Sequence, residues 1–165
     1  MLLSFANWIH ATSIGWAVGG GVPWIWPVCE TLHFIGLAML VGCVGVFDLR
    51  LLGMAKGLEA GPLQRLVPWG VAGFAINFVT GSMFFAGDPY QYIGNTAFWM
   101  KMLFIALAGA NVLIFYAAGL HRRVDAIGPG QDAPRLAKIV AAVSLASWLG
   151  VVFWGRMMPF IGNSF

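Results

Sequence analysis

Long apolar stretches, separated by short polar connections, dominate the hydropathy pattern of the chain. Four of them reach the length of about 20 residues that an α-helix needs to cross a hydrocarbon core of roughly 30 Å. They lie near residues 24–49, 66–87, 97–120 and 136–157. Gly- and Pro-bearing connections divide them. The pattern predicts an all-α fold, an integral membrane four-helix bundle formed by one membrane domain of residues 1–165.

The first 22 residues are too short to span a bilayer and have a different pattern. Phe5, Trp8, Ile9 and Thr12 recur at helical spacing, which favours a short helix in the plane of the membrane interface with its aromatic side toward lipid. A Gly-rich linker at 19–21 then interrupts this helix. We interpret residues 1–22 as a retained interfacial helix and linker.

The composition agrees with a chain that lies almost entirely in the membrane. Hydrophobic residues make up 60% of the 165 residues and charged residues only 9%, against roughly 25% charged in a soluble domain. No nucleophile paired with a base, zinc-binding motif or phosphate loop is present in the sequence. A stand-alone enzyme is therefore the least favoured class, and any chemistry is expected within the bundle.

The basic residues indicate the orientation. Seven of the nine lie in or beside the connections that follow the first and third helices. These are Arg50, Lys56, Arg65, Arg122, Arg123, Arg135 and Lys138. By the positive-inside rule these connections face the cytoplasm and both termini lie on the opposite side. We therefore attribute the net charge of +3 to membrane topology and to contact with the lipid bilayer, and it is no evidence for nucleic-acid binding.

Two ionisable residues, Glu30 and His33, interrupt the outer third of the first spanning stretch. Such residues are costly in hydrocarbon and usually face the bundle interior. His33 lies on a helix face with Cys29, Gly36, Leu40, Cys43 and Phe47, and Glu30 lies beside that face. The pair is predicted either to serve a cofactor, ion or proton, or to form an internal hydrogen-bonded pair that only holds helices together.

Other polar residues extend these alternatives. Lys101 and Arg156 fall in the same outer half, where each either joins Glu30 or extends to the lipid headgroups. Asn111 is a candidate site residue, but with Asn77, Thr80, Ser144 and Ser147 it also suits interhelical hydrogen bonding. At the inner end, Asp48 and Arg50 are able to pair with loop cations or anionic lipid, and we favour a structural role for both.

Haem b is the first cofactor that the histidines suggest. His33 would be one axial ligand, and the second would be His10, a Met or the His33 of a second protomer, because His121 lies at the opposite end of its helix. Copper is the alternative, since Cys29 and several Met residues cluster at the same outer end, and soft sulfur ligands suit Cu(I).

Several motifs resemble a known family. "ETLHFIGLAMLVG" with "FDLRLLG", "GFAINFVTGSMFFAGDP", "FWMKMLFIALAGANVLIF" and "SWLGVVFWGR" are similar to a bacterial family of small four-helix inner-membrane proteins with no assigned activity, which is distantly like the copper-resistance D membrane proteins. The resemblance implies a multi-pass protein of the bacterial inner membrane with periplasmic termini. It also implies His33, Glu30, Lys101 and Asn111 as site positions, without a reaction.

Two functional classes follow. The first is a membrane subunit of electron transfer, in which His33 ligates haem b or contacts a quinone near the outer surface and Glu30 tunes it or relays protons. The second is a non-catalytic accessory or structural subunit, which packs through its small residues against other membrane subunits or a further copy of itself. Copper handling is a variant of the second class.

Overall fold

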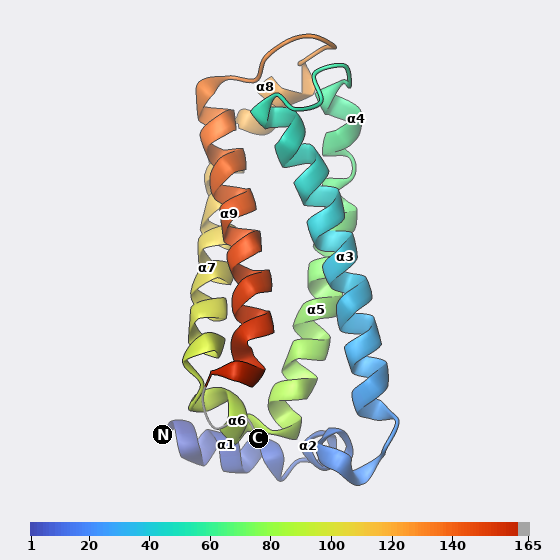
Figure 1. Cartoon of the computed structure of the whole chain (residues 1–165), viewed down its shortest axis with the longest axis vertical. Coiled ribbons are helices and arrows are strands. Elements are labelled where there is room, and N and C mark those ends of the chain that lie inside the picture. Colours follow the sequence, from blue (N-terminus) through green and yellow to red (C-terminus); the bar gives the residue numbers. More distant parts are fainter. Residues whose placement is uncertain (162–165) are drawn as a thin grey trace.

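The computed structural model describes residues 1–161 and is an all-α bundle built around four long helices (Figure 1). These are α3 (Ile25–Leu52), α5 (Val67–Gly87), α7 (Thr96–Ala117) and α9 (Arg135–Met157). Each belongs to a segment that is long and apolar enough to cross a membrane. The predicted four-helix architecture is confirmed, and no predicted boundary differs by more than three residues from the observed one.

The bundle consists of two antiparallel hairpins. α3 packs along α5, and α7 packs along α9, while α3 and α9 join the two hairpins (Figure 1). Most side chains on the outside of these helices are large and apolar, such as Phe34, Phe78 and Leu113. A lipid environment accommodates such a surface, because lipid-facing residues need no polar solvent. The chain is therefore described as a multi-pass membrane protein.

The backbones of α3 and α5 touch at a pair of glycines. A Cβ atom added to Gly73 would lie 2.5 Å from the carbonyl oxygen of Gly36, and one added to Gly36 would lie 2.8 Å from the carbonyl oxygen of Gly73. Small residues that permit so close an approach are typical of helix pairs in membranes. The register of the α3–α5 hairpin is therefore set by backbone contact.

The N-terminal segment closes one end of the bundle, which we call the outer end. It contains α1 (Leu2–His10), α2 (Ser13–Trp16) and the π-helical turn η1 (Ala17–Gly21), and it runs across the bundle axis in Figure 1. The predicted short N-terminal helix is observed as α1, while its placement in the membrane interface stays a prediction. The segment packs against the short helix α6 (Pro89–Ile93), where the hydroxyl of Tyr90 donates a hydrogen bond to Asn7 Oδ1.

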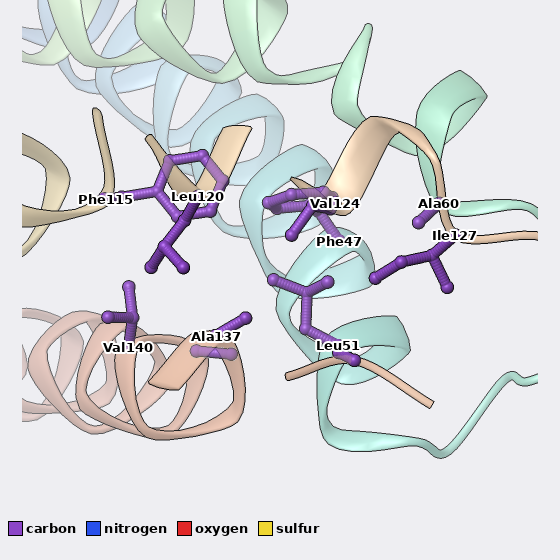
Figure 2. Packing of buried hydrophobic residues seen from close by; sticks show 11 residues of the cluster. Phe47, Leu51, Ala60, Phe115, Leu120, Val124, Ile127, Ala137 and Val140 are labelled. Atoms are coloured by element: carbon purple, nitrogen blue, oxygen red, sulfur yellow. The ribbon is translucent and has the colours of Figure 1, made fainter. Parts of the chain in front are cut away.

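The opposite end, which we call the inner end, is closed by α4 (Ala60–Gln64) and α8 (Leu120–Asp125). Phe47, Leu51, Leu120 and Val124 belong to a buried cluster that packs these caps against the bundle (Figure 2). The third helix was predicted to continue to residue 120 but ends at Ala117, because Gly119 adopts a left-handed conformation with φ of 64°. A glycine tolerates this conformation without steric cost.

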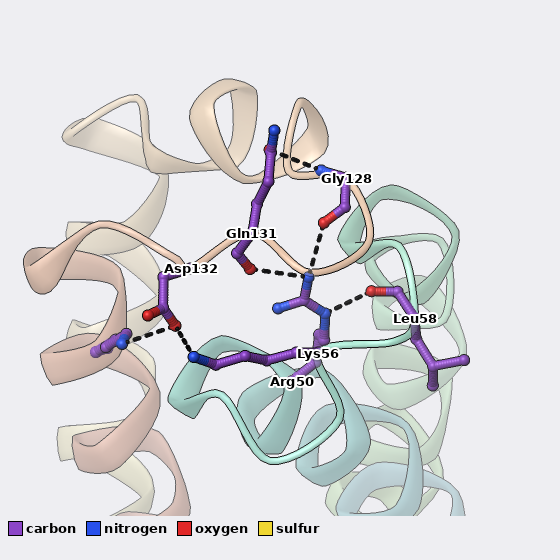
Figure 3. A network of polar contacts seen from close by, with 7 residues as sticks. Arg50, Lys56, Leu58, Gly128, Gln131 and Asp132 are labelled. Carbon is purple, nitrogen blue, oxygen red and sulfur yellow. Dashed lines mark hydrogen bonds and ion pairs between the residues drawn. The ribbon is translucent and has the colours of Figure 1, made fainter.

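Arg50 holds the inner connections together. Its side chain is fully buried, and its guanidinium donates to the carbonyl oxygens of Leu58 at 2.6 Å, Gly128 at 3.1 Å and Gln131 at 3.3 Å (Figure 3). The structure favours the structural role of Arg50 over pairing with anionic lipid, because its charge is directed at backbone carbonyls inside the cap. Asp132 instead binds Lys56 and Lys138, each at 3.0 Å.

Candidate functional site

His33 makes the central polar contact of the outer half of the bundle. Its Nδ1 atom lies 2.7 Å from Oγ1 of Thr80, which reaches across from α5. The Thr80 hydroxyl donates to the carbonyl oxygen of Ile76 at 2.8 Å, one turn earlier in its own helix. A hydroxyl has one proton, so Thr80 is left to accept from the ring. We therefore assign the proton of neutral His33 to Nδ1, which leaves the lone pair of Nε2 free.

Asn77 strengthens the same junction through the backbone of α3. The Asn77 amide is oriented so that both its nitrogen and its oxygen have hydrogen-bond partners. Its Nδ2 donates to the carbonyl oxygen of His33 at 2.7 Å, and its Oδ1 accepts from the backbone amide of Leu37 at 2.9 Å. The nitrogen also lies 3.3 Å from His33 Nδ1, a longer contact than that of Thr80. Asn77 and Thr80 are thus the interhelical residues that the sequence suggested.

The surroundings of the imidazole are aromatic and small. The ring centroid of Phe84 lies 5.6 Å from that of His33, and Phe84 in turn contacts Trp26 at 4.8 Å. A Cβ atom on Gly81 would be 3.7 Å from Cε1 of His33, which places this glycine beside one edge of the ring. Lys101 of α7 lies within electrostatic range of His33. The structure therefore brings two predicted site residues, His33 and Lys101, into one region.

Glu30 does not join this region. It is exposed on the surface of α3 and makes no ion pair with any residue that the structure describes, so the expected pairing with His33, Lys101 or Arg156 is wrong. The reason lies in the helix geometry. Cys29 and His33 are one turn apart and face α5, whereas Glu30 follows Cys29 by about 100° around the helix. Near the outer end of α3 its carboxylate can reach the headgroup region.

Arg156 and His10 also lie apart from His33. The guanidinium of Arg156, an exposed residue near the end of α9, lies over the ring of Phe160 at 5.3 Å. Its orientation toward the headgroups stays a prediction. His10 is exposed at the end of α1, where its ring packs against that of Tyr90 with centroids 5.8 Å apart. No contact between His10 and His33 is found within residues 1–161.

Asn111 lies deeper in the bundle and has a structural contact. Its amide nitrogen donates to the carbonyl oxygen of Val140 at 3.0 Å, which connects α7 to α9. This is the interhelical hydrogen bond that was one of its two expected roles. Asn111 also lines an internal cavity, so the contact with Val140 accounts for only part of its polar surface.

Two sulfur atoms meet one helical turn further out than His33. The thiol of Cys29 lies 3.6 Å from Sδ of Met83, so the same two helices that join His33 to Thr80 also bring these side chains together. Sequence spacing alone could not pair them because they are 54 residues apart. Among the described residues there is no cluster of three or more His, Cys, Asp or Glu side chains that would suit a metal ion.

Comparisons of the chain with protein-family models, with curated proteins and with solved structures found no match.

Proposed function

We propose that this protein is a membrane subunit of electron transfer that holds haem b near its outer end through Nε2 of His33. The observation that carries the proposal is the hydrogen bond from His33 Nδ1 to Thr80, which leaves the second ring nitrogen with a free lone pair. Histidines that bind metals usually have the other ring nitrogen anchored in this way. When bound, the haem would supply one-electron redox chemistry.

The residues around His33 would hold and orient the side chain as a ligand for haem iron. Thr80 sets the tautomer and the orientation of the ring, Phe84 supplies an apolar wall, and Gly81 lies beside the ring edge. Lys101 offers a positive charge for a carboxylate such as a propionate. With these contacts, His33 would be the iron ligand and the bundle would supply a low-dielectric environment. Ligand identity and burial are the features that tune the reduction potential of haem.

The opposite axial ligand is proposed to come from a second copy of the chain. His10 packs on Tyr90, and His121 packs on Tyr116 at the inner end, so neither shares the surroundings of His33. His33 itself is only half-buried, which leaves part of the ring open to a neighbouring protomer. We place the protein in the bacterial inner membrane with both termini in the periplasm, so this haem would lie near the periplasmic surface.

The test is an absorption spectrum of protein purified after expression with ample haem, recorded oxidised and then reduced with dithionite. The proposal expects a Soret band and a reduced α-band in the wild type, and loss of both in His33→Ala. His121→Ala is the matched control and should keep the spectrum. A colourless wild type that remains folded would refute the proposal. Light scattering of the coloured fraction should report a dimer.

A Cu(I)-handling function is the second candidate, and one contact favours it. Cys29 and Met83 place a thiol and a thioether 3.6 Å apart, and His33 follows Cys29 by one turn on the same face. Thiolate, thioether and imidazole are ligands that prefer Cu(I). Titration with Cu(I) against a chromophoric chelator tests this candidate, because Cys29→Ser and Met83→Leu should each weaken binding while Cys43→Ser should not.

If neither haem nor copper binds, the remaining proposal is an accessory subunit. The contacts of His33, Asn77 and Thr80 then act only to join α3 to α5, together with the Gly36–Gly73 approach. In that case His33→Ala would lower the thermal stability of the bundle without altering any spectrum.

A further inference from the structure

A second polar group, separate from the His33 region, lies buried in the inner half of the bundle. Asp48 of α3 is 4% exposed, and its Oδ2 atom has no hydrogen-bond partner in the described part of the chain. No Lys or Arg among the described residues forms an ion pair with it, so the pairing with a loop cation that the sequence allowed is not observed there. A buried carboxyl oxygen without a partner is costly, and its surroundings therefore need an explanation.

Asp48 borders a cavity of about 270 Å³ between the two hairpins. The wall of this cavity is almost entirely apolar and includes the aromatic rings of Phe47, Phe74, Phe115 and Trp148. Ser144 lies beside the Asp48 carboxyl group, and Asn111 contributes a second polar position on the wall. An apolar cavity with a few convergent polar groups is typical of a small-molecule site.

Access to the cavity is from the bilayer. Its inner end is covered by the packed cluster of Figure 2 and by the connections that Arg50 ties together in Figure 3. α5 and α7 both line the cavity but do not pack extensively on one another. Gly109 of α7 lines this side and is exposed. A molecule dissolved in lipid can therefore reach the cavity between α5 and α7.

The polar atoms on the cavity wall favour a ligand that donates hydrogen bonds. Oδ2 of Asp48 accepts no hydrogen bond from the described residues, and Asn111 already donates to Val140 while its own amide oxygen accepts none from them. A flat aromatic ring with hydroxyl groups would stack on the aromatic walls and donate to these oxygens. An oxidised quinone carries only acceptors, so it could bond to Asp48 only in its protonated form and would leave the amide oxygen of Asn111 without a donor.

We propose that this cavity binds a lipid-soluble hydroquinone, with one phenolic hydroxyl donating to Asp48 and its apolar tail leaving between α5 and α7. The site is separate from His33. Asp48 follows His33 by 15 residues on the same helix, which corresponds to about 22 Å along its axis. The proposal does not depend on haem at His33.

The experiment is calorimetric titration of the protein in phosphatidylcholine nanodiscs with decylubiquinol under anaerobic conditions, with empty nanodiscs subtracted. The wild type should show saturable binding of decylubiquinol and at least about tenfold weaker binding of decylubiquinone, a difference of about 1.4 kcal/mol. Asp48→Asn should weaken decylubiquinol binding by a similar factor. Glu30→Gln, a carboxylate change on the same helix outside the cavity, should leave binding unchanged.

A second pair of variants tests the cavity without altering a polar group. A Cβ atom would meet nothing within 4 Å at either Gly109 or Gly42, so both helices tolerate a larger residue there. Gly109→Leu should abolish binding by filling the mouth of the cavity, whereas Gly42→Leu on α3 should not. Absence of saturable binding in the wild type, equal binding of the oxidised and reduced forms, or unaltered binding in Gly109→Leu would overturn the proposal. His33→Ala should bind decylubiquinol normally, which separates this result from failure of the haem proposal.

Discussion

Nδ1 of His33 lies 2.7 Å from Oγ1 of Thr80, and this contact joins two helices whose backbones touch at Gly36 and Gly73. The glycine contact lies one turn further in on α3 and two turns further in on α5. Because the backbone approach sets the register of the hairpin, it also sets the height at which Thr80 meets the ring. The orientation of His33 thus depends on packing as well as on its hydrogen bond.

Thr80→Val should remove the hydrogen-bond partner of the His33 imidazole while preserving the shape of the side chain at position 80. It removes the acceptor for Nδ1, so we expect haem affinity to fall by about 10–100-fold, the usual effect of losing a partner of a metal-binding histidine. The free energy of unfolding should fall by about 1 kcal/mol. Haem titration and thermal unfolding in detergent measure the two effects.

Ser82→Ala is the matched control for Thr80→Val. Ser82 also donates to a carbonyl oxygen one turn earlier, that of Phe78 at 2.8 Å, but it is exposed and makes no contact with α3. Its removal should change neither measurement. Equal haem affinity in Thr80→Val and wild type would contradict the assigned role of Thr80.

Gly73→Ala should separate α3 from α5. The new methyl group would lie 2.5 Å from the carbonyl oxygen of Gly36 and 2.8 Å from the amide nitrogen of Leu40, and backbone atoms cannot move aside cheaply. We expect a loss of about 1–3 kcal/mol in the free energy of unfolding. Unfolding in mixed micelles with increasing denaturing detergent measures it.

Gly42→Ala provides the comparison, because a Cβ atom there would meet no other atom within 4 Å. Alanine favours a helix over glycine by up to about 1 kcal/mol, so this variant should be unchanged or slightly more stable. If both variants lost stability equally, the close packing of Gly73 against Gly36 would not explain the loss, because Gly42 has no such contact.

The hydropathy pattern was sufficient to predict the four long helices, because their length depends on local composition and on the thickness of a bilayer, and the residue spacing predicted a short N-terminal helix. It also predicted the face of α3 that carries Cys29, Gly36 and Leu40, all of them buried. The short caps α4 and α8 were missed, since a helix of one or two turns has no periodic signal of its own.

The site was harder to predict because it depends on which helices meet and at what height. Asn77 and Thr80 were assigned only to helix packing, although they hold His33, and Met83 meets Cys29 through the same register. From its spacing to His33, Glu30 was predicted to lie beside the packed face of α3. It is exposed instead, because it follows the buried Cys29 by one residue and therefore points away from α5. The cavity at Asp48 exists because α5 and α7 stay apart, which no single helix reveals.

Arg50→Lys should loosen the inner cap without removing the charge. Lysine has no planar fork of donors and cannot reach the carbonyl oxygens of Leu58, Gly128 and Gln131 together. Each charge-assisted hydrogen bond lost costs roughly 1.5–3 kcal/mol. Limited trypsin digestion should therefore cleave the connection at Lys56 faster than in wild type. Arg122→Lys, an exposed change in α8, should not alter the digestion rate, and equal rates in all three proteins would contradict the role of Arg50.

Asp132 makes the stability of the inner connections dependent on pH. Hydrogen bonds from Lys56 and Lys138 hold the pKa of this exposed carboxyl group below its ordinary value of 3.8. The folded state therefore favours the ionised form, and the contribution is fully present above the ordinary pKa. It is lost as the pH falls through the lowered pKa of the folded protein.

Asp132→Asn tests this dependence by thermal unfolding at different pH values. The variant should melt slightly below wild type at about pH 6, and the difference should shrink as the pH falls below 3.8 and the wild-type carboxyl becomes protonated. The difference should also shrink in high salt because all three side chains are solvent-accessible. Asp125→Asn, a change in the same cap at a carboxylate without an ion pair among the described residues, should show no such convergence. A difference that does not shrink as the pH is lowered would exclude the ion pairs as its cause.

The orientation of the bundle follows from the distribution of its basic residues. Seven of nine lie at the inner end, so that end should face the cytoplasm and α1 and α6 should face the periplasm. In a background with Cys29→Ala and Cys43→Ala, single cysteines at Gly94 and Gln131 report on the two ends, since both positions are exposed. An impermeant maleimide added to cells with a permeabilised outer membrane should label Gly94→Cys and leave Gln131→Cys unlabelled until the inner membrane is opened. The converse pattern would invert the bundle, placing His33 near the cytoplasmic surface and the Asp48 cavity in the periplasmic half.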